Sequence, residues 1–273
     1  MESNQHQMLK FHQQVPEADL LSRLDSIRPS SCCSDLPPAC YCPAYVGPHY
    51  GGMAKILFVG LDSGTSAGTT KPMTAKEWQS SIFSDAYRKQ EDQKTNAAWN
   101  AHYKGCVMTA SAILKMACGS ECGSACRVKP SSECVLSYFA QTNAVKCAPP
   151  KYGMAFVAEH RIVSCLAMNL FGEVEVLQPD VIILQGRNHD SGHIHKDFER
   201  ELAAQHWGNL AIVEGSLVGT ITWNRGLMAG RKSVLGLFKH PAAKGKSNFK
   251  NTWLREVLPS ILKIHGLLGA LQS

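Results

Sequence analysis

Apolar residues occur along this chain in two patterns, short continuous runs and longer stretches with helical spacing. Continuous apolar runs predict strands that are buried on both faces, as in a parallel sheet. They occupy residues 55–59, 136–142, 180–185, 210–214, 217–223 and 233–238. Helical spacing predicts helices at residues 16–27, 100–116, 156–171, 196–206 and 252–268. The alternation of the two patterns predicts an α/β fold with three α/β/α layers and a central, mostly parallel sheet.

Residues 1–273 are predicted to form a single domain, because no internal repeat or convincing linker divides the chain. A helical and cysteine-rich extension occupies about residues 1–52, a polar, turn-rich insertion is expected near 65–100, and a cysteine-rich insertion near 118–134. A hydrophobic content of 44% and a charged content of 18% are ordinary for a globular protein and exclude a disordered chain.

Positive charge is concentrated in one part of the chain, although the net charge is only +6. From Arg225 to Arg255 there are eight lysine or arginine residues and no aspartate or glutamate. Such a stretch suits the phosphate backbone of DNA. The candidate DNA contacts are Arg231, Lys244 and Lys246. A solvated, lysine-rich loop is the alternative interpretation of the same composition.

Residues 1–7 lack the apolar core of a signal peptide, and no apolar run reaches the length of a membrane-spanning helix. We therefore expect a cytoplasmic protein with no membrane partner, in which disulfides are disfavoured by the reducing environment. The chain contains eleven cysteines. An odd count in a reducing compartment indicates metal binding together with spare buried thiols.

Three polar residues stand at or just beyond the ends of predicted strands. Asp62 follows the first of these strands within the glycine-bounded segment 60–64. Asn143 follows a second predicted strand, and His240 follows the last one. In open α/β folds the carboxyl ends of strands carry the ligand site.

Each of these residue types suits one task in the hydrolysis of an N-glycosidic bond. A carboxylate such as Asp62 stabilises an oxocarbenium-like sugar and orients the attacking water. A histidine donor such as His240 stabilises negative charge on the departing base. The carboxamide of Asn143 offers a donor and an acceptor that match the edge of a flipped pyrimidine. Each residue also has a structural alternative: a turn aspartate, a histidine that ends a strand, and an asparagine that bonds loop backbone.

Residues 60–64, 142–150 and 240–242 resemble motifs of the uracil-DNA glycosylase superfamily, most closely its iron–sulfur members. The most specific match is Thr-Asn-Ala-Val-Lys-Cys-Ala-Pro-Pro at 142–150, which is similar to the Thr-Asn-Val-Val-Lys-Cys-Arg-Pro-Pro run of those members. The acid loop matches the family only in part. Its aspartate matches that of Gly-Gln-Asp-Pro-Tyr in the most active uracil enzymes, but Ser63 replaces the proline. His-Pro-Ser of the family corresponds here to His-Pro-Ala.

The resemblance implies roles for individual residues. Asp62 and His240 are implied to be catalytic. The residues implied to touch the flipped base are Gly60, Leu61, Asn143 and Tyr103. Leu61 departs from the family pattern because it lacks a polar group. Tyr103 is placed as the aromatic residue that stacks on the base, with His102, Trp99 and Trp78 as alternatives.

The resemblance also implies a [4Fe–4S] cluster, with zinc as the alternative metal. The implied ligands are Cys40, Cys42, Cys147 and Cys165, and Cys33 can stand in for Cys40. The remaining group of Cys118, Cys122, Cys126 and Cys134 forms either a second metal site or a set of free thiols.

The activity that this resemblance implies is that of a monofunctional DNA glycosylase, which acts as a monomer on single- or double-stranded DNA. Its substrate is expected to be uracil or a hypermodified cytosine, such as the glucosylated hydroxymethylcytosine of phage DNA. Its biological role would be DNA repair or phage defence. Two alternatives stay open: a DNA-binding protein of the same fold that recognises a lesion without cutting, and a metalloprotein in which the cysteines are the function.

Overall fold

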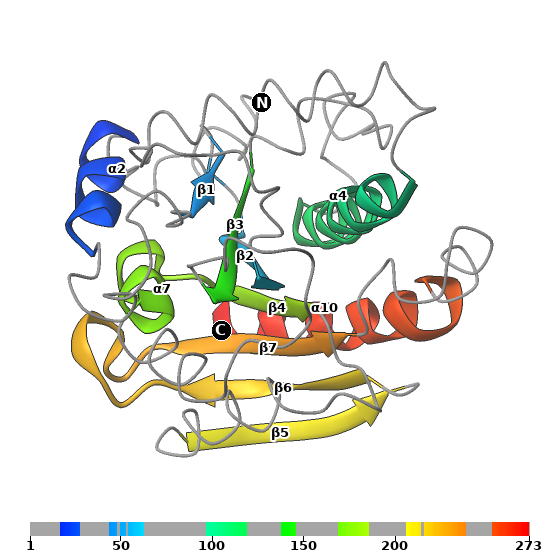
Figure 1. Cartoon of the computed structure of the whole chain (residues 1–273). Helices are drawn as coiled ribbons and strands as arrows, with labels where there is room; N and C mark the ends of the chain where they lie inside the picture. The colour runs from blue at the N-terminus through cyan, green and yellow to red at the C-terminus, as the bar shows by residue number, and fades with distance from the viewer. Residues whose placement is uncertain are drawn as a thin grey trace, which may run out of the picture.

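A computed structural model of the chain describes residues 17–27, 44–47, 50–52, 54–62, 97–118, 138–145, 169–185, 206–213, 216–238 and 253–272. These residues form a mixed sheet with helices packed against it, which confirms the α/β class (Figure 1). The strands are β1 (Tyr45–Val46), β2 (Ile56–Asp62), β3 (Phe139–Val145), β4 (Val181–Gln185), β5 (His206–Val213), β6 (Ser216–Thr222) and β7 (Lys232–Phe238). The helices are α2 (Glu17–Ser26), α4 (Ala97–Cys118), α7 (Phe171–Leu177) and α10 (Leu258–Gln272), with the short helical turns η5 (Gly226–Met228) and η6 (Trp253–Val257).

The sheet has seven strands in the order β1-β3-β2-β4-β7-β6-β5. Its four central strands, β3, β2, β4 and β7, run parallel. The outer strands β1, β6 and β5 pair antiparallel with their neighbours. The expected predominance of parallel pairs is therefore found only in the centre. A parallel pair needs a crossover of roughly a dozen or more residues, whereas only residues 214–215 and 223–231 separate β5, β6 and β7.

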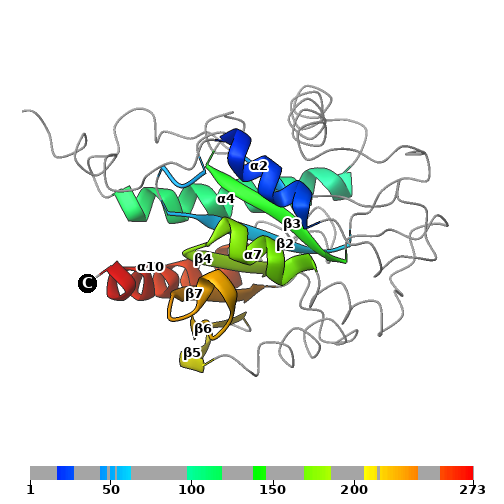
Figure 2. The same ribbon diagram turned by 90° about the vertical axis from the view of Figure 1, so that its left-hand side faces the viewer.

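Helices cover both faces of the central strands (Figures 1 and 2). On one face, α2 and α7 pack on a core that includes Leu57 and Ile182. On the other face, α4 and α10 pack on a core that includes Ile56 and Phe58. Successive residues of β2 belong to different cores because alternate side chains of a strand point to opposite faces.

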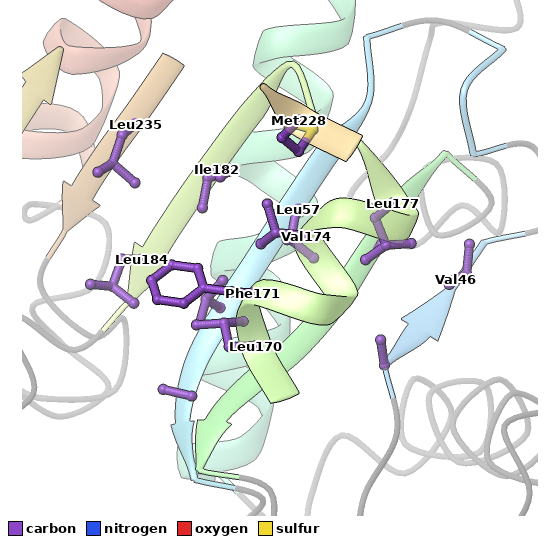
Figure 3. Close-up of a cluster of buried hydrophobic side chains, with 14 of the residues drawn as sticks. Val46, Leu57, Leu170, Phe171, Val174, Leu177, Ile182, Leu184, Met228 and Leu235 are labelled. Carbon is purple, nitrogen blue, oxygen red and sulfur yellow. The ribbon is translucent and has the colours of Figure 1, made fainter. Parts of the chain in front are cut away.

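The spacing of its apolar residues explains the short helix α7. Phe171, Val174 and Leu177 are buried and lie three residues apart, so one stripe of the helix faces the sheet. Figure 3 shows these side chains above the residues of β2 and β4. The helix ends at Gln178, whose φ of 47° is left-handed and whose N–H donates to Val174 O at 2.8 Å. Pro179 follows and cannot continue the helix.

The predicted helices at 16–27, 100–116 and 252–268 are confirmed by α2, by α4, and by η6 with α10. The prediction of helix at His206 is wrong, because His206 begins β5 and pairs with Thr222 of β6. The predicted helical residues 156–168 and 196–205 lie outside the described residues. Although α4 has 22 residues, no helix in the described ranges is both long and apolar enough to cross a membrane.

Candidate functional site

The path of the chain through the four parallel strands marks one edge of the sheet as a ligand site. The chain runs from β2 through α4 to β3 on one side, and then returns to β4 on the other side of β2. Ligands of open α/β sheets bind beyond the carboxyl ends of the strands at such a reversal. We call the side where β2, β3, β4 and β7 end the carboxyl edge, and the side where they begin the amino edge.

Asn143 lies beside Gly60 at the carboxyl edge, because the two residues are register partners in the parallel pair of β2 and β3. A Cβ atom built on Gly60 would stand 2.6 Å from Asn143 Oδ1. The Asn143 side chain therefore covers the Cα atom of Gly60, and any larger residue at position 60 would displace it. Two predicted base-contacting residues from separate motifs are thus in direct contact.

A hydrogen bond holds the end of β3 to α7, which covers one face of the sheet. Thr142, the neighbour of Asn143, donates a hydrogen bond from its hydroxyl to Glu173 Oε2 at 2.5 Å, and both residues are buried. A hydrogen bond to a carboxylate is stronger than one between neutral groups. Neighbouring residues of a strand point to opposite faces. The bond of Thr142 therefore holds β3 on the face that α7 covers, and Asn143 lies on the other face, which α4 covers.

β2 continues beyond Gly60 to Leu61 and Asp62. Asp62 is the register partner of Val145, the last residue of β3. The backbone of the predicted catalytic aspartate is therefore held at the carboxyl edge, two residues beyond the contact of Gly60 with Asn143. The side chains of Leu61 and Asp62 lie outside the described set, so their roles stay predictions.

The structure adds a residue that the sequence motifs did not indicate, Gln185 at the end of β4. Val59 is the register partner of Leu184, so Gln185 stands next to Gly60, on the side opposite Asn143. Gln185 is only 3% exposed. The available sequence signal was a single polar residue that closes the apolar run of β4.

Cys106 of α4 holds the carboxamide of Gln185. Its thiol donates a hydrogen bond from Sγ to Gln185 Oε1 at 3.3 Å, and the contact is buried. Burial raises the pKa of Cys106 to about 12, against the weaker, opposite effect of the hydrogen bond to Gln185. The thiol is therefore protonated at neutral pH, and it acts as a donor rather than as a nucleophile.

α4 carries Tyr103, the predicted stacking residue, toward the same edge. The helix returns the chain from the end of β2 to the start of β3, so it runs from the carboxyl edge to the amino edge. Tyr103 precedes Cys106 by three residues, which places its backbone about 4.5 Å farther toward the carboxyl edge. Its side chain is outside the described set, and stacking on a base stays a prediction.

β7 brings the chain to the carboxyl edge at Phe238, two residues before His240. Phe238 is buried, and its ring covers Gly236, where an added Cβ atom would stand 2.8 Å from Phe238 Cε2. His240 and the predicted DNA contacts Lys244 and Lys246 lie outside the described residues. Their roles also stay predictions.

Arg231 is not brought to this site. It is exposed at the amino edge, where its Nη1 donates a hydrogen bond to Gln178 Oε1 at 2.5 Å. The seven residues of β7 separate Arg231 from the carboxyl edge, which corresponds to roughly 20 Å at the rise of a strand. The predicted DNA contact at Arg231 is therefore remote from Asn143 and Gly60.

The predicted cluster ligands Cys40, Cys42, Cys147 and Cys165, and the substitute Cys33, lie outside the described residues. So do Cys122, Cys126 and Cys134, whereas Cys118 is the last residue of α4. Cys106 is buried and takes no part in a disulfide. Within the described ranges, no three potential metal-ligating side chains are grouped together. The metal site is thus a prediction from the sequence alone.

No protein-family model matches the chain, and no curated protein shows a significant match to its sequence.

Proposed function

We propose that this protein is a monofunctional DNA glycosylase, which hydrolyses the N-glycosidic bond of a flipped base and leaves an abasic site. The observation that carries the proposal is the contact of Asn143 with Gly60 at the carboxyl edge. This contact aligns the amide-bearing strand with the strand that ends in the acid loop. β7 ends at the same edge, just before His240. The strands β2, β3 and β7, each of which contains or precedes one of the three motifs, therefore end at the same edge of the sheet.

The proposed reaction breaks the bond between the sugar C1′ atom and the base nitrogen, and the bonding electrons leave with the base. Water adds its oxygen to C1′, and the proton that it releases is taken up by the departing base or by solvent. Asp62 stabilises the positive charge that develops on the sugar and orients this water. His240 donates a hydrogen bond to the base oxygen that gains negative charge.

Asn143 reads the edge of the flipped base, because its carboxamide presents a donor and an acceptor side by side. Gly60 is required next to it because a side chain at position 60 would displace the amide. Tyr103 supplies the stacking surface. The substrate in this proposal is uracil or a hypermodified cytosine, and a pocket enlarged by the expected insertion near residues 65–100 would accept the bulkier modified base.

The proposal extends to the fold and the metal. A three-layer α/β/α arrangement like that of the uracil-DNA glycosylase superfamily is supported by the helices on both faces of the central strands. Cys40, Cys42, Cys147 and Cys165 hold a [4Fe–4S] cluster, or zinc, which ties the N-terminal segment to the core. Lys244 and Lys246 bind DNA phosphates.

The proposal is tested by base release from oligonucleotides that contain uracil, hypoxanthine, 5-hydroxymethylcytosine or its glucosylated form. Alkaline cleavage reports the abasic sites. We expect release of one of these bases, and a loss of rate of roughly 100-fold or more in Asp62→Asn, since the charge that stabilises the sugar is removed. The matched control is Asp19→Asn, which neutralises an exposed aspartate of α2 and should leave the rate unchanged.

Two results would contradict the proposal. Silence across the panel with tight DNA binding retained would identify a lesion-binding protein that does not cut. Release that is equal in the wild type and in Asp62→Asn would remove the acid loop from the mechanism.

A further inference from the structure

Three neighbouring strands present two carboxamides with a glycine between them. In register, Asn143 of β3, Gly60 of β2 and Gln185 of β4 stand at the same level. Adjacent strands are about 4.8 Å apart, so the two amide-bearing Cα atoms are separated by roughly 10 Å. We call these three residues the amide row.

The amide row lies on the face of the sheet that α4 covers. Phe58 stands two residues before Gly60, and Ile183 stands two residues before Gln185. Both belong to the core that α4 and α10 pack against, and residues two apart on a strand share a face. The contact of Cys106 with Gln185 places α4 directly over one end of the row.

Gln185 places a buried amide at the end of an apolar strand. The other residues of β4, from Val181 to Leu184, are apolar and fully buried. A buried carboxamide costs free energy unless its donors and its acceptor are hydrogen-bonded, and a thiol is a weak donor. The hydrogen bond from the Cys106 thiol assigns which atom of the Gln185 amide is Oε1. The Nε2 group is then the amide atom that does not face Cys106.

We propose that Gln185 is a specificity-determining residue that, together with Asn143, binds a planar heterocycle at the carboxyl edge of the sheet. The Nε2 group of Gln185 donates a hydrogen bond to a carbonyl oxygen of this ligand. The inference rests on the proposed function, in which the ligand is the flipped base. It adds a chemical requirement, a carbonyl on the side of the base that faces β4. Uracil, hypoxanthine and cytosine derivatives meet this requirement, whereas adenine has no carbonyl.

The test measures base release together with the binding of free uracil, hypoxanthine and adenine by calorimetry. It uses the full-length protein, Gln185→Met, which keeps the side-chain volume and loses the amide, and Gln185→Asn, which shortens the amide. The matched control is Gln141→Leu. Gln141 also carries a carboxamide on β3, but it lies two residues closer to the amino edge than Asn143, in register with Phe58. Thermal unfolding of every variant checks the fold.

We expect Gln185→Met to weaken uracil or hypoxanthine binding by about 10- to 100-fold, with a matching fall in the rate of release. Gln141→Leu should stay within about twofold of the wild type. The wild type should bind hypoxanthine more tightly than adenine, and Gln185→Met should reduce that preference. If Gln185→Met fails to fold, Gln185→Asn decides the question by the same measurements, with weaker binding expected.

Wild-type base affinity and release rate in a folded Gln185→Met variant would overturn the inference. The same would be true of Gln185→Asn if it is the variant that folds. Base binding that depends on Gln185 without any release would refute the proposed glycosylase and keep the inference. Base release that does not depend on Gln185 would keep the proposed glycosylase and refute the inference. A wild-type protein that neither binds nor releases any of these bases would overturn both.

Discussion

The two edges of the central sheet use polar side chains in different ways. At the amino edge, Asp180 Oδ2 accepts a hydrogen bond from Lys55 N at 2.8 Å, and this bond ties the start of β2 to the start of β4. Trp223 Nε1 donates to Ser233 Oγ at 2.9 Å, and Ser233 in turn donates to Pro179 O at 2.7 Å. At the carboxyl edge, by contrast, the Asn143 side chain covers a glycine.

Burial also shifts the pKa of two groups at the amino edge. Burial lowers the pKa of Lys55, although the nearby Asp180 carboxylate opposes this effect. Burial also raises the pKa of Tyr50, whose hydroxyl donates to Leu177 O at 3.2 Å. These groups of the amino edge serve as contacts between strands and helices. At the amino edge, hydrogen bonds such as that of Asp180 join the starts of strands to one another, whereas at the carboxyl edge the bonds of Thr142 and Gln185 join strands to helices. The proposed function puts its ligand at the carboxyl edge.

The largest effect is expected from Trp223→Ala at the amino edge. Trp223 is 1% exposed and packs edge-to-face on Phe171 at 6.2 Å, so its truncation should lower the free energy of unfolding by about 3–5 kcal/mol. Urea denaturation measures this loss. Leu227→Ala is the control, because Leu227 is 60% exposed. If Trp223→Ala abolished base release while leaving stability unchanged, the division between the edges would be wrong.

Gly60→Ala should affect the carboxyl edge in the opposite way, with a large loss of activity and a small loss of stability. The new methyl group displaces the Asn143 amide, and misplacement of a positioning group by about 1 Å can lower a rate by up to roughly 100-fold. Steady-state base release measures the effect. Gly266→Ala is the matched control, since a Cβ atom at Gly266 of α10 has nothing within 4 Å. Equal rates in both variants would argue against a function for the Asn143 contact.

The buried thiol between α4 and β4 predicts a change of stability with pH. The ordinary pKa of the thiol is 9.0, and in the folded protein the pKa of Cys106 is about 12. The folded state therefore favours the protonated thiol, so its contribution is full below pH 9.0 and is lost as the pH rises toward 12.

Urea denaturation of the wild type and of Cys106→Ala at about pH 8 and about pH 10 tests this. The stability advantage of the wild type should shrink by about 1 kcal/mol between the two conditions, because titration of other groups cancels in the difference. An advantage that is the same at both pH values would show that the thiol is not held in its protonated form by burial.

The smallest effect is expected from Arg231→Ala. Arg231 lies at the amino edge beside Gln178, so its removal should change DNA affinity by less than about twofold and leave the salt dependence unaltered. Lys246→Ala is the comparison: it should weaken binding to all sequences and lower the salt slope by about one. Fluorescence anisotropy over a range of salt concentrations measures both. A clear loss of affinity in Arg231→Ala would place a DNA contact at the amino edge.

The sequence predicted the central strands well, because runs such as Ile56–Val59 and Val181–Leu184 are apolar throughout and are buried on both faces. It failed at His206, where pairing with β6 overrides the local polar pattern. It also predicted too many parallel pairs, because hydrophobic pattern alone does not specify strand direction. The short connections between β5, β6 and β7 contained that information.

Site residues that belong to sequence motifs could be predicted, but residues that reach the site through strand pairing could not. Gly60 and Asn143 belong to recognisable segments, and the structure brings them into contact. Gln185 carries no motif, since its position next to Gly60 depends on the pairing of β2 with β4. Arg231 shares one basic stretch of sequence with Lys244 and Lys246, but the length of β7 separates Arg231 from the carboxyl edge. The two lysines lie outside the described residues.

The strand order has a consequence for the order of folding. β5, β6 and β7 pair through short turns, whereas the bond from Lys55 to Asp180 joins residues 125 positions apart. Pairing over such a separation requires a long loop to close first, and this slows folding. We expect the antiparallel hairpins to form early and the union of β2 with β3 and β4 to form late. The amide row would then be assembled only in the final steps, so a partly folded chain would have no competent site.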